Sequence, residues 1–93
     1  MTEIDVQTAD EADGWTCLVR VSDARGSSEY RVRVSRADLQ RLAPGASDPT
    51  DLVRRSFEFL LEREPKESIL QTFDLPVIGR YFPEYEATIR SRV

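Results

Sequence analysis

Apolar and polar residues alternate in two runs between residues 14 and 35, and this alternation constrains the fold of the 93-residue chain more than any other feature. The apolar members of the two runs are Trp15, Cys17, Val19, Val21, Tyr30, Val32 and Val34. A period of two places such side chains on one face of a β-strand, so each run predicts a strand with one buried face. Residues 23–27 lie between the runs and contain Gly26, which adopts a positive φ easily. We therefore predict a β-hairpin over residues 14–35.

The residues after the hairpin predict helices that cover its apolar face, because two strands alone are only marginally stable in water. Ser35 is followed three residues later by an acid, which favours an N-cap for a short helix that ends near Leu42. Prolines and a glycine divide the C-terminal part, where helical turns are expected near residues 65–72, 75–82 and 84–91.

A longer helix is predicted from Pro49 to about Glu64, where Asp48 can cap the free amides and the next proline stops the hydrogen bonding. Its apolar side chains are Leu52, Val53, Phe57, Phe59, Leu60 and Leu61. They span about half of the helix circumference, which is more than one sheet face would cover. We therefore expect a second neighbour that contacts Leu52 and Phe59, either the C-terminal segment or another subunit.

The first fourteen residues hold five acids and no base, with Ile4 and Val6 among their few apolar members. Such a segment is either a flexible arm or a short edge strand in which Ile4 and Val6 face inward. The sequence leaves both alternatives open.

Together these patterns predict one α+β domain over residues 1–93: an antiparallel β-hairpin or three-stranded meander, followed by one main helix and short C-terminal helices. Residues 1–13 form the acidic arm or edge strand, residues 14–35 the hairpin and residues 36–93 the helical part. Hydrophobic residues make up 40% of the chain and charged residues 32%, which is typical of a folded domain.

The expected compartment is the cytoplasm. No apolar run approaches the roughly 20 residues that span a bilayer, and residues 1–5 lack the features of a secretion signal. Cys17 is the single cysteine and has no internal disulfide partner, which is consistent with a reducing environment. We expect no membrane association.

No set of residues in the sequence predicts catalysis, so we expect a protein that is not an enzyme and uses no metal or cofactor. The chain contains no histidine, which is the usual general base near neutral pH and a common metal ligand. Cys17 alternates with apolar strand residues and is interpreted as a buried small side chain. Carboxylate pairs occur at Glu58/Glu62 and Glu84/Glu86, but acid-base catalysis would require a pocket that shifts their pKa values. Glu58 and Glu62 lie beside arginines and are expected to form solvated ion pairs.

Arginines of the hairpin suggest one hypothesis, nucleic-acid binding. Arg20, Arg31 and Arg33 should share the hairpin face that points away from the core, where they could contact phosphates. The net charge of −4 and the lack of aromatic residues among these arginines argue against this reading.

Aromatic residues near the C-terminus suggest the leading hypothesis, a non-enzymatic protein-interaction or regulatory module. The run from Tyr81 to Tyr85 either closes the core or forms a groove for a partner. This hypothesis predicts self-association, for example as a dimer, or a dedicated protein partner. The candidate contact residues are Leu52, Phe59, Tyr81, Phe82 and Tyr85.

Residues 48–70, together with Phe73-Asp74-Leu75 and residues 81–85, resemble a group of small uncharacterised bacterial proteins. This resemblance covers roughly half the chain and implies no activity. In layout, a hairpin followed by a helix also resembles the small domain of HicB-type antitoxins. The glycine- and proline-containing strand motif expected in that family is missing here, so the likeness concerns fold alone.

Overall fold

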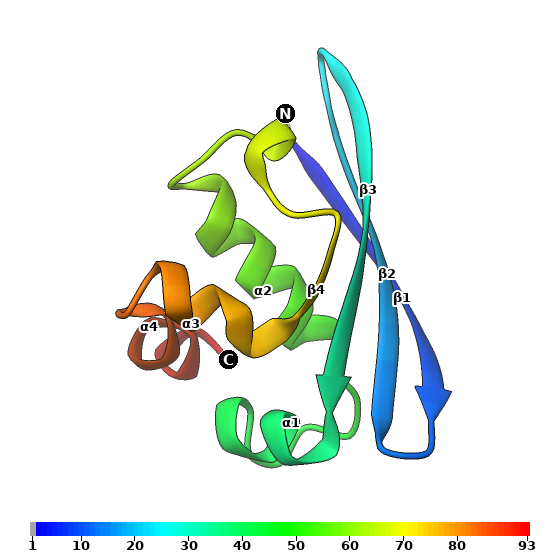
Figure 1. Cartoon of the computed structure of the whole chain (residues 1–93), viewed down its shortest axis with the longest axis vertical. Helices are drawn as coiled ribbons and strands as arrows, with labels where there is room; N and C mark the ends of the chain where they lie inside the picture. The colour runs from blue at the N-terminus through cyan, green and yellow to red at the C-terminus, as the bar shows by residue number, and fades with distance from the viewer. Residues whose placement is uncertain (1) are drawn as a thin grey trace.

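The computed structural model describes residues 2–93, which form a four-stranded sheet with all helices on one face (Figure 1). The sheet order is β1-β2-β3-β4, with the first three strands antiparallel and β4 parallel to β3. The strands are β1 (Glu3–Glu11), β2 (Gly14–Asp23), β3 (Gly26–Ser35) and β4 (Thr72–Asp74). This α+β architecture confirms the predicted fold class. Residues 3–11 form the edge strand of the meander, which resolves the two alternatives for the acidic segment.

The register of the sheet explains why the alternating residues share one face. Val19 lies between Val6 on β1 and Tyr30 on β3, and the neighbouring rows continue this pattern on the side toward the helices. Gly26 has a φ of 134° at the turn between β2 and β3. At Gly14 a Cβ would lie 2.1 Å from the backbone oxygen of Val34, so the close approach of β3 requires glycine there.

Two α-helices follow the meander, α1 (Arg36–Leu42) and α2 (Thr50–Leu61). As predicted, Ser35 caps α1, with its Oγ accepting the Asp38 N–H at 3.0 Å. The Asp48 carboxylate accepts the Thr50 N–H at 2.9 Å, and this hydrogen bond lowers the pKa of Asp48. Helix α2 ends three residues before the expected Glu64, because the Leu60 carbonyl accepts N–H groups from two successive residues and tightens the last turn.

Short elements make up the rest of the chain. They are η1 (Lys66–Ser68), β4, η2 (Leu75–Val77), α3 (Ile78–Tyr81) and α4 (Tyr85–Arg92). The helical turns fall in the three predicted regions, whereas β4 was not expected. Only Phe73 of β4 is buried, so a strand this short has no periodic signal in the sequence.

The core lies between the sheet and α2 and continues between α2 and the C-terminal helices. Phe57 contacts Tyr30 at a ring-centroid distance of 5.0 Å, and Phe59 contacts Tyr85 at 5.3 Å. The C-terminal segment is therefore the second neighbour of the wide apolar arc. Leu52 is equally buried, with 1% of its surface exposed.

Lys66 attaches the tip of the β2–β3 hairpin to the helical layer. Its buried ammonium group donates to both carboxylate oxygens of Asp23 at 3.1 Å and to Glu67 at 2.8 Å. The Tyr30 hydroxyl donates to the Lys66 carbonyl at 2.6 Å. Hydrogen bonds to Glu67 and then Asp23 raise the pKa of Lys66, which holds the lysine in its charged form.

Candidate partner-binding groove

A groove with mostly apolar walls opens between the end of α2, the η1–β4 segment and α3. Its volume is about 300 Å³. The lining residues are Leu60, Glu64, Ser68, Ile69, Leu70, Phe73, Val77, Ile78, Tyr81 and Phe82. We call this feature the α2–α3 groove.

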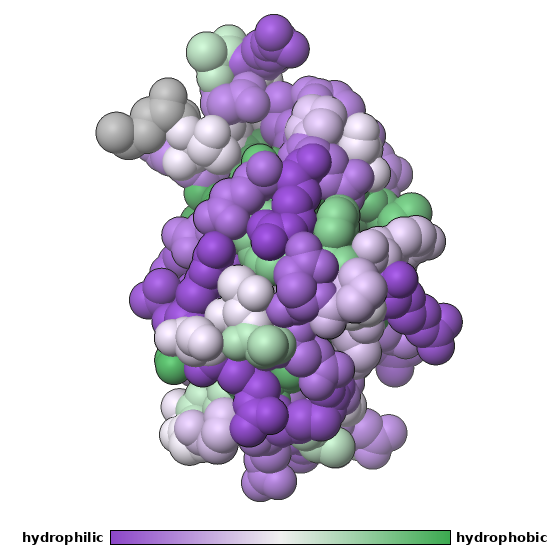
Figure 2. All heavy atoms as spheres, turned by 90° about the vertical axis from the view of Figure 1, so that its left-hand side faces the viewer, coloured by the Kyte–Doolittle hydropathy of each residue, from purple (hydrophilic) through white to green (hydrophobic). Residues whose placement is uncertain are grey.

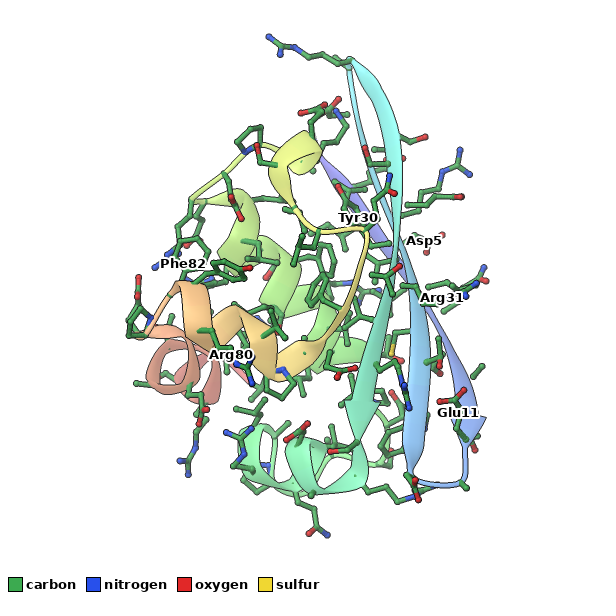
Figure 3. All side chains as sticks on the ribbon, in the orientation of Figure 1. Asp5, Glu11, Tyr30, Arg31, Arg80 and Phe82 are labelled. Carbon is green, nitrogen blue, oxygen red and sulfur yellow. The ribbon has the colours of Figure 1, made fainter. Side chains whose placement is uncertain are left out.

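Chain breaks at prolines create the walls of the α2–α3 groove. Pro65 follows α2 and Pro76 lies in η2. The chain between these prolines joins the sheet beside β3 as the edge strand β4, and α3 follows directly after η2. Phe82 then follows α3 and packs edge-on against Phe59 at a centroid distance of 5.9 Å (Figure 3). Residues from three separate segments therefore line the groove, and Phe82 links it to the core through Phe59.

Two large apolar side chains project to solvent at the groove. Leu70 is 50% exposed and Tyr81 is 66% exposed, and elsewhere in residues 2–93 only Leu18 and Val93 are comparably exposed large hydrophobic residues. Hydrophilic side chains predominate on the molecular face shown in Figure 2, where hydrophobic ones emerge as small, separated areas. Exposed apolar side chains beside a groove are a recurrent feature of binding sites.

Glu64 is the only charged residue that lines the groove. It is half-buried and has no ion-pair partner within residues 2–93. In contrast, the neighbouring Arg63 is held in place: its Nε donates to Glu84 at 3.3 Å, and its guanidinium lies 3.6 Å above the Phe59 ring. A cation at the groove would therefore find an unpaired carboxylate at Glu64.

The five candidate contact residues separate into two groups. Tyr81 and Phe82 line the groove as candidate contacts. Leu52, Phe59 and Tyr85 are at most 1% exposed and pack inside the chain, because α4 covers that side of α2. Burial removes these three from any surface of the folded chain, which corrects their assignment as partner contacts. Sequence reasoning missed Leu70, whose exposure depends on the path of the chain into β4.

Arg20, Arg31 and Arg33 lie together on the outer face of the sheet, away from the helices, as Figure 3 shows for Arg31. Acids interrupt this group: Arg20 lies between Asp5 and Glu29 in one cross-strand row, and Asp74 lies opposite Arg33. No aromatic residue of β1–β4 points to this face. The arginines thus form a mixed-charge surface without stacking platforms for bases.

The groups considered for catalysis lie apart from one another. Cys17 is fully buried in β2, and this burial, with a smaller contribution from the Asp48 charge, raises the pKa of its thiol to about 11. Glu62 forms ion pairs with Arg92 and Arg63, of which the hydrogen bond from Arg92 contributes most to lowering its pKa. Glu58 is exposed on α2. In residues 2–93 no group of three or more acidic or cysteine side chains could hold a metal ion.

Comparisons of the chain with protein-family models, with curated proteins and with solved structures find no match. Among the helices of residues 2–93, none combines the length and hydrophobicity needed to cross a lipid bilayer.

Proposed function

We propose that this protein is a non-enzymatic protein-interaction module that binds an amphipathic peptide segment of its partner in the α2–α3 groove. The observation that carries the proposal is the pair of exposed apolar side chains, Leu70 and Tyr81, beside a mainly apolar groove. Removing this surface from water on binding would contribute about 25 cal/mol per Å² of buried apolar area, before the costs of association.

The chemistry of the groove defines the peptide. Its apolar walls favour leucine-like or aromatic anchors, since binding energy concentrates where such side chains fill a pocket. Glu64 favours a lysine or arginine next to the anchors, and the net charge of −4 favours a basic partner during approach. A second copy of this acidic chain is a less complementary occupant.

Selection from a displayed random-peptide library tests the proposal. Peptides selected on the wild-type protein should share apolar anchors flanked by a basic residue. Their affinity should fall by about tenfold or more for the variant Leu70→Ser/Tyr81→Ser, because the variant loses apolar surface worth at least about 1.4 kcal/mol.

Leu18→Ser provides the matched control, because Leu18 is 48% exposed on the opposite side of the sheet. This variant should bind the selected peptides as the wild type does. Equal losses in both variants, or a library that yields no peptide dependent on Leu70 and Tyr81, would overturn the proposal. Size-exclusion chromatography with light scattering would separate peptide binding from self-association.

A further inference from the structure

A second surface, the free edge of β1, lies at the end of the sheet opposite β4. Strand β1 is nine residues long and pairs with β2 in an uninterrupted register from Glu3 to Glu11. Apart from this pairing with β2, no backbone–backbone hydrogen bond joins β1 to the rest of residues 2–93, and only the Glu11 carbonyl accepts a side-chain donor, Arg36, at 3.5 Å. The edge therefore presents a regular row of unpaired N–H and C=O groups, which can template another strand.

The apolar cover of the sheet is incomplete at this edge. Ile4 and Val6 face the helical layer and pack against the core, yet both remain partly exposed. Further along the same face, Thr8 and Asp10 are exposed. Apolar side chains of a strand paired with β1 could cover the exposed parts of Ile4 and Val6 and so enlarge the apolar inner face of the sheet.

The acidic side chains of β1 determine which kind of strand can pair with its free edge. Glu3 and Asp5 point to the outer face and Asp10 to the inner face, and β1 contains no base (Figure 3 shows Asp5). In an antiparallel pair of two β1 strands centred on Gln7, Glu3 would lie opposite Glu11 of the second copy. Like charges directly opposite each other destabilise a strand pair, and opposite charges stabilise it.

We infer that the β1 edge binds an extended segment of another protein in which basic and apolar residues alternate, by adding it to the sheet as a fifth strand. Basic side chains would pair with Glu3 and Asp5 on the outer face, and apolar ones would cover Ile4 and Val6 on the inner face. This site is separate from the α2–α3 groove and does not depend on it.

Titration of the full chain with a short peptide of alternating lysine and valine tests the inference. NMR spectra of the ¹⁵N-labelled protein should show shifts concentrated in β1, and the outward amides of β1 should exchange more slowly with solvent. Two control peptides should fail to produce these changes: one in which glutamate replaces lysine, and one in which central prolines prevent strand pairing.

Charge removal on the protein gives an independent readout. Glu3→Gln/Asp5→Asn should weaken binding by about tenfold and reduce its dependence on salt. Asp51→Asn/Glu58→Gln removes the same charge from the exposed side of α2 and should leave the affinity within about twofold of wild type. Equal effects of the two variants, equal binding of the acidic peptide, or shifts confined to Leu70 and Tyr81 would overturn the inference.

Discussion

Ser56 and Tyr85 form a buried hydrogen-bonded pair whose two hydroxyl groups are not equivalent. Ser56 Oγ donates to the Leu52 carbonyl at 2.7 Å, so the Tyr85 hydroxyl must donate to Ser56 Oγ, also at 2.7 Å. Without Tyr85, Ser56 keeps the Leu52 carbonyl as its hydrogen-bond partner, whereas the Tyr85 hydroxyl has no acceptor other than Ser56 Oγ within residues 2–93. Burial raises the pKa of Tyr85, which keeps this donor protonated.

This asymmetry predicts different costs for the two hydroxyl deletions. Ser56→Ala leaves a buried donor unsatisfied and should lower the free energy of unfolding by about 1–3 kcal/mol, whereas Tyr85→Phe should cost about 1 kcal/mol. Urea unfolding of both variants and of the double variant measures these values. A larger cost for Tyr85→Phe would contradict the assigned donor direction.

Burial of the Cys17 thiol leads us to predict that the folded protein loses stability at alkaline pH. The pKa of its thiol is raised to about 11 in the folded chain, so it stays protonated where the unfolded thiol ionises, and the unfolded state gains relative stability. The contribution of the protonated thiol to the stability of the folded chain is fully present below the pKa of the unfolded thiol, and it is lost as the pH rises toward 11. Unfolding free energies at neutral pH and at about pH 10 should differ more for wild type than for Cys17→Ala. Equal slopes for the two proteins would show that the thiol is not the cause.

A strand or helix could be predicted from the sequence when its pattern of buried and exposed residues was long enough. Strands β2 and β3 carry full two-residue alternation and were predicted with their buried face. Strand β1 left two alternatives, because only Ile4 and Val6 alternate before polar residues begin. Strand β4 has one buried residue and depends on pairing with β3, so no local pattern reveals it. The groove was only partly predictable, through Tyr81 and Phe82, because its other walls depend on where β4 places Leu70.

Two glycines provide a test of strand pairing. Gly14→Ala places a methyl group against the backbone of β3 and should lower the free energy of unfolding by about 1–3 kcal/mol or more. Gly79→Ala in α3 is the matched control, since a Cβ there meets no atom within 4 Å, and alanine in a helix should be neutral or stabilising by up to about 1 kcal/mol. Thermal unfolding of both variants measures the contrast. Similar effects at both positions would contradict the close β2–β3 approach at Gly14.

On the scale of the whole molecule, charge is distributed without a continuous basic surface. The outer sheet face combines three arginines with five carboxylates: Arg20, Arg31, Arg33, Glu3, Asp5, Glu11, Glu29 and Asp74. An acidic net charge and interleaved acids disfavour contact with a phosphate backbone. The surface thus differs from the basic stripe that nucleic-acid binding by the arginines requires.

Heparin chromatography tests this charge distribution. The wild-type protein should elute before the salt concentration reaches about 0.15 M, and Arg20→Ala/Arg31→Ala/Arg33→Ala should elute no later. Strong retention of the wild type that disappears in the triple variant would instead support nucleic-acid binding through the outer face.

The central functional claim is that the α2–α3 groove, and not the outer sheet face, contacts the partner peptide. Methyl NMR of the protein titrated with a library-selected peptide tests this claim most directly, because leucine methyl groups lie on both surfaces. We predict large shifts and intermolecular contacts for the methyl groups of Leu60 and Leu70, and unchanged signals for Leu18. Shifts at Leu18 with unchanged signals at Leu60 and Leu70 would contradict the account.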